Sequence, residues 1–555
     1  MGETSAARGG AILMRQTTLS VPLEVKPASC ALLTSLIDKL RDSKEPAGFP
    51  DQYARLHRQT PSLHFMSVSV FASADFDALF VLEANFDGPL GAFWGQLEAT
   101  LGPELREMLR CCKAPLDEDG PLYQAVAAVG SQAPIAPYFE ARTQRPSVFH
   151  HGNRGLTRDR ILQESALFKS TRKALDATNV NGVGLYAGAS SGEVHQKLRK
   201  ALLGDYPWLD QPAPARIPPL ERFGDIARLV VFAVAAVFCL SAPGLILALA
   251  MPPHRYLVLM GVVWAIGLLI SLVIFLRRAS LPGTGVPSRF SLALTLLRQA
   301  PLMIGVVLVY LLAATAVSLG PAMLITGVDR ATAVQETARW VAQGAASIPV
   351  SVIVLLAWLR YLERRDSSQD APPQDERILR EMVRREDWIA QNHMGSLVLV
   401  KPGVLRSILA HAGHLGLGLF LRVQATNGYL GSMRTVHFAH WAFVNNSNRL
   451  MFFSNFDHSW ASYLDDFIEK AHAGLTLAWG SGVGFPPTRF LVLDGASHGR
   501  QFKDWALASR AVSRFWYSAY DDLTVDQIER QARIALGLRK AKLKPKGADT
   551  WLRDL

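Results

Sequence analysis

Two stretches of the chain present the same chemical groups in the same order. From His64 the sequence reads HFMSVSVFASADFDALFVLEANFDG, and from His437 it reads HFAHWAFVNNSNRLMFFSNFD. Each begins with His-Phe and ends with Asn-Phe-Asp, so a histidine and an aspartate recur at matching places. Imidazole and carboxylate groups are the usual general acids and bases of enzymes. The repeated pattern therefore raises acid–base chemistry as one interpretation of the sequence.

A structural interpretation competes with it at both aspartates. Asp87 and Asp457 each follow an apolar run and precede a helical pattern, which is where a helix N-cap belongs. The sequence predicts either catalytic carboxylates or caps at these two positions. His393 is a third catalytic candidate, in the polar run from Gln391 to Met394. Amide and imidazole groups in a row are poor core material unless they are paired, so this run is either a site or a capping network.

Further histidines and one arginine are candidates for holding a cofactor or an anion. In an alternating strand His437 and His440 point to opposite faces, so one of them points inward, as a core residue or as an axial ligand. Arg154 lies in a basic loop that is either solvated or in contact with an anion or carboxylate. His411 and His414 share a helical spacing of three residues, but no carboxylate accompanies them. No metal site is predicted.

The spacing of apolar residues predicts the elements that position these groups. In both stretches an alternating run precedes a turn and a second strand, over 78–84 and 450–454. Helical patterns follow, and then a further strand, a Leu-Thr loop and another helix. This order approaches the split βαβ unit of ferredoxin-like folds. Two such sheets in one chain can bury their open apolar faces against each other as an α+β barrel.

Between the two stretches the chain is apolar enough to enter a membrane. Runs without charge predict four transmembrane helices, each near the ~20 residues needed to cross a bilayer, at about 229–250, 256–276, 302–325 and 340–359. The connection 277–298 contains arginines and no acidic residue, so the positive-inside rule places it and both termini in the cytoplasm. We therefore expect a multi-pass protein of the inner (plasma) membrane, with the bilayer as a partner.

The composition agrees with a membrane protein in a reducing compartment. Only 19% of the residues are charged, the formal net charge is +11, and the mean hydropathy is positive. The cysteines, among them the vicinal Cys111 and Cys112, form no disulfide framework. The basic run RKAKLKPK at 539–546 predicts anionic lipid headgroups as a partner. Nucleic acid is not expected, because no aromatic residues are interleaved with the basic ones.

These observations give an α+β fold class with a defined domain order. Two ferredoxin-like repeats form an intramolecular barrel, and a four-helix transmembrane unit is inserted between them. The predicted segments are an N-terminal extension (1–59), the first repeat (60–180), a linker (181–228), the transmembrane unit (229–360), a second linker (361–385), the second repeat (386–540) and a basic tail (541–555).

The duplicated pattern resembles the dimeric α+β-barrel superfamily, which includes haem-binding dye-decolourising peroxidases, chlorite-dismutase-like proteins and small monooxygenases. A nearer likeness is to uncharacterised bacterial proteins with the motifs QNHM, KPG and HFA-W/SN-D-SW-SYLDDF, found here at 391–394, 401–403 and 437–467. The resemblance covers about 60–175 and 385–535 and implies a fold rather than an activity. A dye-decolourising peroxidase has a Gly-x-x-Asp-Gly loop. This chain has Glu83-Ala-Asn-Phe-Asp87-Gly88, without the leading glycine, and His458 follows Asp457.

Two functions follow from the resemblance and the residues. One is an integral membrane protein whose cytoplasmic barrel binds an apolar or membrane-derived ligand without clear catalysis. The other is a membrane-anchored, haem-dependent peroxidase-like or monooxygenase-like oxidoreductase, with Asp87, Asp457 and His393 as catalytic residues and His437, His440 and Arg154 around the cofactor. Between Arg406 and Arg422 only 15 residues in a row lack a formal charge, too few to cross a bilayer, so a buried or interfacial helix is expected in the apolar segment 403–421. A lipid-soluble ligand could pass along it from the membrane to the barrel.

Overall fold

The computed structural model of the chain divides into two compact units, which are described one at a time. The α+β unit consists of Met1–Glu221 and Ser367–Leu555, and the apolar-helix unit consists of Arg222–Asp366. The structure describes residues 15–42, 51–73, 76–178, 182–277, 329–367, 390–424, 433–511 and 513–555, with isolated positions 308, 311, 312, 327, 376 and 380. The chain therefore leaves the α+β unit once and returns to it.

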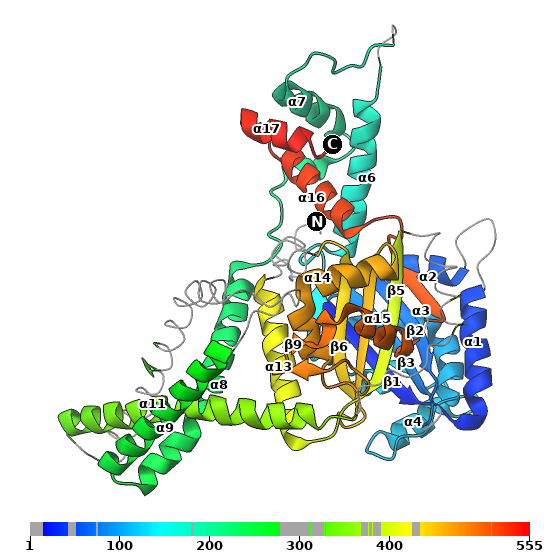
Figure 1. Cartoon of the computed structure of the whole chain (residues 1–555). Helices are drawn as coiled ribbons and strands as arrows, with labels where there is room; N and C mark the ends of the chain where they lie inside the picture. Colours follow the sequence, from blue (N-terminus) through cyan, green and yellow to red (C-terminus); the bar gives the residue numbers. More distant parts are fainter. Residues whose placement is uncertain are drawn as a thin grey trace. The chain divides into compact units, whose positions relative to one another are not determined.

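Two antiparallel sheets form the centre of the α+β unit (Figure 1). The four-stranded sheet has the order β1 (Gln16–Glu24), β3 (Leu79–Asp87), β2 (Leu63–Phe71) and β11 (Phe515–Ser518). The five-stranded sheet has the order β10 (Arg510–Ala511), β5 (Gln391–Leu399), β7 (Arg449–Asp457), β6 (Val436–Val444) and β4 (Val148–His151). A short hairpin is formed by β8 (Thr488–Arg489) and β9 (Leu493–Asp494).

The two halves of the α+β unit exchange strands. The N-terminal strand β4 pairs with β6 of the C-terminal half, with Phe149 opposite His440. In return, the C-terminal strand β11 pairs with β2, with Trp516 opposite Ser67. The sequence predicted these last strands inside their own repeats, at 60–180 and 386–540. Their pairing across the halves means that neither sheet is complete without the other half of the chain.

The first strand, β1, was not anticipated by the sequence pattern. It lies within 1–59, which was expected to be an extension, and pairs with β3 so that Gln16 is opposite Asp87. In the C-terminal half β5 pairs with β7 in the same way, with Gln391 opposite Asp457. Leu19, Val21 and Leu23 of β1 pack in the core beneath the helices and alternate with Thr18, Ser20 and Pro22, and the proline is tolerated because β1 is an edge strand.

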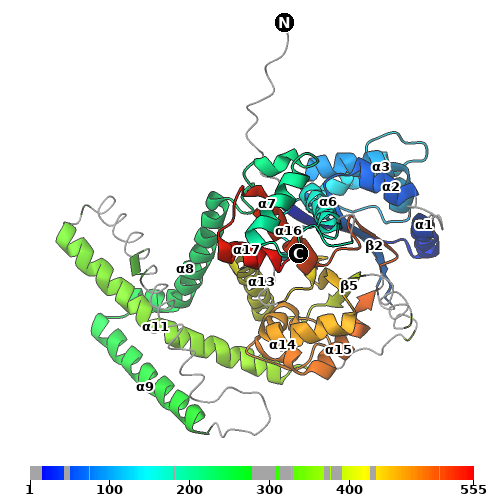
Figure 2. The same cartoon turned by 90° about the horizontal axis from the view of Figure 1, so that it is seen from above.

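The two sheets face each other, and helices cover their outer faces (Figure 2). Period-two alternation puts Leu79 and Val81 on the inner face of β3, where they pack with Met451 and Phe453 of β7. The outer face of the four-stranded sheet packs against α1 (Cys30–Asp42), α2 (Asp51–Gln59), α3 (Leu90–Arg110), α4 (Gly120–Ala127) and α5 (Ala136–Ala141). The five-stranded sheet packs against α13 (Val404–Gln424), α14 (Trp460–Trp479) and α15 (Gly499–Ala508).

Helices from both halves form a further apolar cluster in the α+β unit. Its members are α6 (Arg158–Leu175), α7 (Ser191–Leu202), α16 (Val525–Arg539) and α17 (Pro545–Leu552). Trp551 of α17 is buried there, and its indole donates a hydrogen bond to the Ile534 carbonyl of α16 at 3.1 Å. Residues 181–228 and 541–555 were expected to be a linker and a basic tail. They instead contain α7 and α17, because both segments carry apolar residues at helical spacing.

The apolar-helix unit contains three described helices. These are α8 (Pro219–Ala250), which begins in the α+β unit, α9 (Pro253–Arg277) and α11 (Arg330–Arg364). They cover the predicted spans 229–250, 256–276 and 340–359, whereas the predicted span 302–325 falls almost wholly outside the described residues. Gly244 of α8 packs directly on Ser347 of α11, so small residues let these two helices approach closely.

Length and composition make three described helices able to cross a membrane. They are α8 over Pro219–Ala248, α11 and α13. In contrast to the other two, α13 belongs to the α+β unit and packs against it along one side. The part of the chain that the structure describes thus contains both a membrane-compatible helical unit and an apolar helix attached to a folded α+β unit.

The strand exchange predicts an intolerant site at Gly152, immediately after β4. Its N–H donates to the His437 carbonyl at 2.5 Å, and a Cβ there would fall on the Val436 carbonyl oxygen. We expect Gly152→Ala to lower the free energy of unfolding by about 1–3 kcal/mol through overpacking. Gly95→Ala is the matched control, because a Cβ on this exposed residue of α3 meets no atom within 4 Å.

Denaturant unfolding of the detergent-purified chain, followed by tryptophan fluorescence, measures both variants. Gly95→Ala should match the wild type or exceed its stability by about 0.5–1 kcal/mol, since alanine is the better helix former. Equal stability of Gly152→Ala and the wild type would show that β4 does not dock on β6 as described.

Candidate functional site

The recurring histidine and aspartate form a buried pair in each half. His64 Nε2 lies 3.0 Å from an Asp87 carboxylate oxygen, and His437 Nε2 lies 2.8 Å from Asp457 Oδ1. A β-bulge falls at each histidine, since the register shifts between Leu63 and Phe65 and between Val436 and Phe438. Such a bulge redirects a side chain. Here each imidazole reaches the aspartate at the end of the neighbouring strand.

The sequence offered Asp87 and Asp457 as N-caps of the helices that directly follow them, and this prediction is wrong. The N-cap residue of α3 is Pro89 and that of α14 is Ser459. Asp87 Oδ2 instead accepts a hydrogen bond of 2.8 Å from the first N–H of α6, and Asp457 Oδ2 accepts one of 2.8 Å from the first N–H of α16. The positive end of a helix dipole favours a carboxylate there. Each aspartate therefore joins a strand to a helix that lies distant in sequence.

A glutamine at the start of the first strand repeats this scheme in both halves. Gln16 Nε2 donates to the Leu156 carbonyl at 2.9 Å, and Gln391 Nε2 donates to the Leu523 carbonyl at 2.5 Å. Together with the aspartates, these contacts fix the loops that precede α6 and α16. Because the same contacts occur in both halves, they belong to the scaffold. Asp87, Asp457 and His437, predicted as catalytic or cofactor-binding residues, thus all have structural partners.

The two pairs differ at the second imidazole nitrogen. His64 Nδ1 lies 2.7 Å from the Tyr520 hydroxyl, whereas His437 Nδ1 has no hydrogen-bond partner among the described residues and is fully buried. The position that corresponds to Tyr520 is Asn153, whose amide donates to Glu529 at 2.8 Å instead. Burial raises the pKa of Tyr520 well above its usual value, so the phenol stays protonated.

Between the two sheets lies a group of ionisable side chains that the two halves do not share. We call Glu83 of β3, His393 of β5 and His440 of β6 the Glu83 centre. His393 Nε2 is 3.6 Å from one Glu83 carboxylate oxygen, and His440 Nδ1 is 4.0 Å from the other. All three side chains are almost completely shielded from solvent. The sequence had singled out His393 and His440 but not the acid that lies between them.

Hydroxyl and amide groups surround the Glu83 centre. The Glu83 carboxylate accepts hydrogen bonds from the Ser67 hydroxyl at 3.1 Å and from the Asn85 amide. The Ser20 hydroxyl lies 2.9 Å from His440 Nε2, and the Ser513 hydroxyl lies 2.7 Å from His393 Nδ1. These contacts fix the orientation of both imidazoles, because each ring is held at a nitrogen other than the one nearest to Glu83.

Aromatic rings close the centre on its apolar side. The Phe453 ring stacks on both imidazoles, with centroid distances of 5.7 Å to His393 and to His440. Trp516 stacks on His393 at 6.2 Å, and its indole N–H donates to Asn455 at 2.8 Å. Beyond Phe453 the space between the sheets is apolar. The centre is therefore a polar group at the edge of a hydrophobic interior.

Burial and mutual charge set the protonation of the centre. Burial alone raises the pKa of Glu83, but the His393 contact, the His440 charge and the Asn85 hydrogen bond together hold it below its usual value. Burial lowers the pKa of His440 to about 4, although Glu83 opposes this shift. At neutral pH Glu83 is therefore a carboxylate and His440 a neutral imidazole. A proton donor or a cation at the centre would have Glu83 as its acceptor.

The strand register identifies the residues that take these places in the other half. Glu83 lies opposite Ser20 in β1, and Phe453 lies opposite Gly395 in β5, so Phe453 takes the place of Glu83. By the same register Thr18 corresponds to His393, and Ser67 corresponds to His440. None of these three counterparts is ionisable. The Glu83 centre thus departs from the scaffold that the two halves have in common.

The polar run around His393 divides into two roles. Gln391 bonds to the loop before α16, and Asn392 Nδ2 donates to the His458 carbonyl at 2.8 Å. Only His393 turns into the space between the sheets. Gln391 and Asn392 therefore belong to a capping network, and His393 belongs to the candidate site.

Arg154 takes part in a separate buried cluster near the start of α8. Its guanidinium donates to the Arg422 carbonyl and to the Glu221 carboxylate, both at 2.6 Å. His151 is buried close by, and burial together with the charges of Arg154 and Arg422 holds its pKa well below the usual value. Arg154 therefore contacts a carboxylate of the chain itself, on the segment that leads into the apolar-helix unit.

The other candidates are explained by packing. His414 is buried between Ser147 Oγ at 2.8 Å and the Ala478 carbonyl at 2.9 Å, whereas His411 is exposed. Cys111 and Cys112 are buried, and burial raises the pKa of both thiols. Among the described residues no three histidine, cysteine, aspartate or glutamate side chains are arranged to hold a metal ion.

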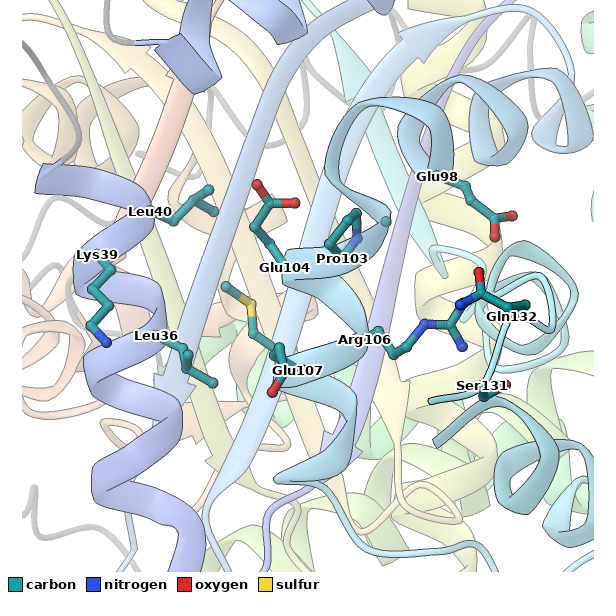
Figure 3. Close-up of a pocket in the computed structure, with 12 residues that line it drawn as sticks. Leu36, Lys39, Leu40, Glu98, Pro103, Glu104, Arg106, Glu107, Ser131 and Gln132 are labelled. Atoms are coloured by element: carbon teal, nitrogen blue, oxygen red, sulfur yellow. The ribbon is translucent and has the colours of Figure 1, made fainter. Parts of the chain in front are cut away.

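A surface groove of about 710 Å³ between α1 and α3 lies apart from these residues (Figure 3). Its polar side chains already support the fold. Glu98 accepts from the Ile135 N–H at 2.8 Å, and Arg106 donates to the Val126 carbonyl at 2.7 Å. A second cavity of about 20 Å³ lies behind β5 and β7 among aromatic residues and is too small for an organic ligand. Neither is a candidate site.

Comparison with known proteins gives no matching family model, no matching curated protein and no matching solved structure. The function has to be argued from the geometry of the site.

The repeated pairs predict a stability effect without any chemistry. Asp457→Asn keeps the shape of the side chain but removes the charge that faces His437 and the first turn of α16. We expect it to lower the free energy of unfolding by about 1–3 kcal/mol. Asp522→Asn is the control, because this aspartate is largely exposed and lies 3.4 Å from Lys169. An exposed pair of this kind contributes about 0–1 kcal/mol. Equal denaturant stabilities for the two variants would contradict the scaffold role.

The lowered pKa of His440 predicts a pH effect on stability. Between about pH 4 and 6.5 the unfolded state binds a proton at this histidine that the folded state does not, so stability falls as the pH falls through this window. His440→Gln should flatten the slope of unfolding free energy against pH by about one proton there. Ser20→Ala, which removes the partner of His440, should shift the curve and leave its slope nearly unchanged. Parallel wild-type and His440→Gln curves would refute the assignment.

Proposed function

We propose that the α+β unit is an intramolecular barrel of two ferredoxin-like repeats attached to a multi-pass, four-helix membrane unit. Both halves have in the same order a first strand, a helical connection, two consecutive strands, a second helical connection, a last strand and a closing helix, and the C-terminal half adds the short strands β8, β9 and β10. The exchanged strands and the repeated Gln16 and Gln391 contacts support a duplication. The assignment of this arrangement to the dimeric α+β-barrel superfamily belongs to the same proposal.

The placement of both termini in the cytoplasm follows from the same argument. Residues before α8 and after α11 belong to one α+β unit, so a chain that crosses a membrane between them must cross an even number of times. The described helices α8, α9 and α11 would be joined by a fourth in the predicted span 302–325. The arginine-rich connection 277–298 supports the cytoplasmic side of the inner membrane. Anionic headgroups suit the exposed lysines at 540, 542, 544 and 546.

We infer that this barrel binds an apolar or membrane-derived ligand whose polar end is recognised at the Glu83 centre. The observation behind this inference is the burial of a carboxylate and two imidazoles between the sheets, beside the apolar cluster that includes Phe453. Buried ionisable groups are costly, and a hydrophobic replacement is often neutral or stabilising. The corresponding positions in the other half have no such groups. A ligand with one polar group and an apolar body matches both the centre and its surroundings.

Entry of a ligand would require the sheets or the Phe453 and Trp516 rings to move. The side chains of the centre are shielded from solvent in this structure. A hydroxyl or amide on the ligand would replace the Ser513 or Ser20 contact with a similar one. The Glu83 carboxylate would keep its acceptor role. Such a replacement keeps the imidazole nitrogens paired, and the displaced Ser513 hydroxyl would retain its contact of 2.9 Å with Ser69, which limits the cost of burial.

The residues expected around haem do not fit that cofactor. Both nitrogens of His440 lie within 3.5 Å of the Thr18 and Ser20 hydroxyls, and His437 Nε2 is bonded to Asp457. Arg154 is engaged with Glu221. His393 Nε2 has no hydrogen bond among the described residues, but the Glu83 carboxylate lies 3.6 Å from it. The haem-dependent oxidoreductase is therefore an alternative that the experiment below tests, and no catalytic step is assigned.

The experiment compares molecules that co-purify with the full-length protein and with two variants of the centre, His393→Ala and Glu83→Gln. His195→Ala and Glu104→Gln are controls, because His195 bonds to a carbonyl in the helical cluster and Glu104 pairs with Arg55 near the surface. Solvent extracts are analysed by mass spectrometry, and visible absorption and iron content are recorded on the same samples.

We expect one apolar compound to co-purify with the wild type and with both controls. Its amount per mole of protein should be at least about tenfold lower in the two centre variants. A hydrogen bond to a charged group contributes about 1.5–3 kcal/mol, which corresponds to at least this factor. The same compound at equal amounts in all samples would contradict recognition by the centre. A Soret band with equivalent iron would replace the ligand-binding proposal by the haem alternative.

A further inference from the structure

One side of α13 exposes large apolar residues to solvent. Val404 is 79% exposed, Ile408 60% and Leu415 54%. Spacings of four and seven residues put these three on the same side of a helix. We call them the α13 face. No Asp, Glu, Lys or Arg occurs from Ser407 to Leu421. The exposed His411 lies on the same side, and its two ring nitrogens lie 2.8 Å from the Ser407 carbonyl and 3.1 Å from the Ser447 hydroxyl.

The opposite side of α13 is fixed on the α+β unit. His414 is buried between β4 and α14 by the hydrogen bonds to Ser147 and Ala478. Gly413 lies against Leu477, so that a Cβ on it would come within 2.7 Å of that side chain. To cross a bilayer, α13 would have to leave these contacts and transfer a histidine to hydrocarbon. Its length and composition alone therefore do not make it a spanning helix.

The C-terminal end of α13 is tied to the beginning of the first membrane-compatible helix. The Arg422 carbonyl accepts from Arg154, and both arginine guanidinium groups lie near Glu221, at 2.6 Å for Arg154 and 3.6 Å for Arg422. Glu221 lies in the first turn of α8. The charge-free run of α8 begins at Leu229, which is eight residues further on, or about 12 Å along a helix. A bilayer that α8 enters at Leu229 would therefore begin within about 12 Å of Glu221 along the chain.

We infer that the α13 face lies in the membrane interface, with its apolar residues inserted among phospholipid acyl chains beside the entry point of α8. An apolar helix side of this kind, held parallel to the surface by a folded domain, buries itself about 5–10 Å into the boundary between headgroups and acyl chains. The occupant of the face is the bilayer of the protein itself. The inference rests on membrane insertion of α8, as proposed above, and does not depend on the ligand of the Glu83 centre.

The test uses single cysteines labelled with an environment-sensitive fluorophore in the full-length protein. Ile408→Cys and Leu415→Cys report on the face, in a background without the accessible Cys30 and Cys239; Cys111 and Cys112 are buried. Val231→Cys on α8, at a residue 67% exposed, is the control for insertion, and Leu116→Cys, at a fully exposed turn residue, is the control for water. Each is reconstituted into phosphatidylcholine–phosphatidylglycerol vesicles with or without brominated acyl chains.

Brominated lipid should quench the labels at 408 and 415 about twofold, as it does at 231, and leave the label at 116 unchanged. Labels at 408 and 415 that behave like the one at 116 overturn the inference. So do labels that are shielded from water and not quenched by bromine, because protein then covers the face. Failure to quench at 231 removes membrane insertion itself, and with it the inference. None of these results alters the comparison of co-purified compounds, which tests the Glu83 centre separately.

Discussion

The reciprocal exchange of last strands is the constraint on which the α+β unit depends. Neither sheet can be completed within one half of the chain, since β4 needs β6 and β11 needs β2. The Ser147 hydroxyl contacts the Trp441 carbonyl, 294 residues away in sequence. Contacts this distant are entropically costly to close and form late in folding. The N-terminal half therefore stays incomplete until the chain has passed through the apolar-helix unit and the C-terminal half is present.

The exchange also explains why equivalent polar groups are buried in both halves. A last strand that docks on the other half must be held at its far end, and the loop after it is fixed by a glutamine, an aspartate and a histidine in both halves. Asp87 and Asp457 each satisfy a helix N-terminus and an imidazole with one carboxylate. A buried carboxylate is tolerated when several donors share it. In both halves the repeated motif that first suggested acid–base chemistry thus connects a strand to a helix N-terminus.

Much of this fold follows from the sequence, because its strongest signals are local. Alternating residues predicted β2, β3, β6 and β7, and charge-free runs predicted segments that are helical as α8, α9 and α11. β1 also alternates, with Leu19, Val21 and Leu23 between Thr18, Ser20 and Pro22, but a proline inside such a run weakens the indication of a strand. The strand exchange was missed because period and turn signals describe a strand but not its partner. Which strand pairs with which is decided by long-range packing that no short pattern records.

Local patterns likewise indicated the two histidines of the Glu83 centre but not the acid between them. His393 and His440 stood out because histidines are rare in apolar strands. Glu83 was not predicted as a site residue. An acid in the middle of the apolar strand LFVLEANFD nevertheless indicates a buried polar site more strongly than the aspartate at its end. A charged residue almost never lies fully buried without a partner. Its partners come from strands of the other half, so the distances between Glu83 and the two histidines became visible only with the sheets face to face.

Each residue of the Glu83 centre has an equivalent position in the opposite half of the chain, which shows what other side chains the scaffold accepts there. By the shared register, Phe453 of the five-stranded sheet occupies the place of Glu83, and Thr18 and Ser67 of the four-stranded sheet occupy those of His393 and His440. The scaffold therefore accepts an aromatic ring and two hydroxyls at these positions. A buried carboxylate between two imidazoles is seldom better for stability than an apolar residue of similar size. The centre takes Glu83 from the N-terminal half and both histidines from the C-terminal half, and none of the three recurs at its equivalent position. The ligand proposed above would give these groups a role that the shared scaffold does not.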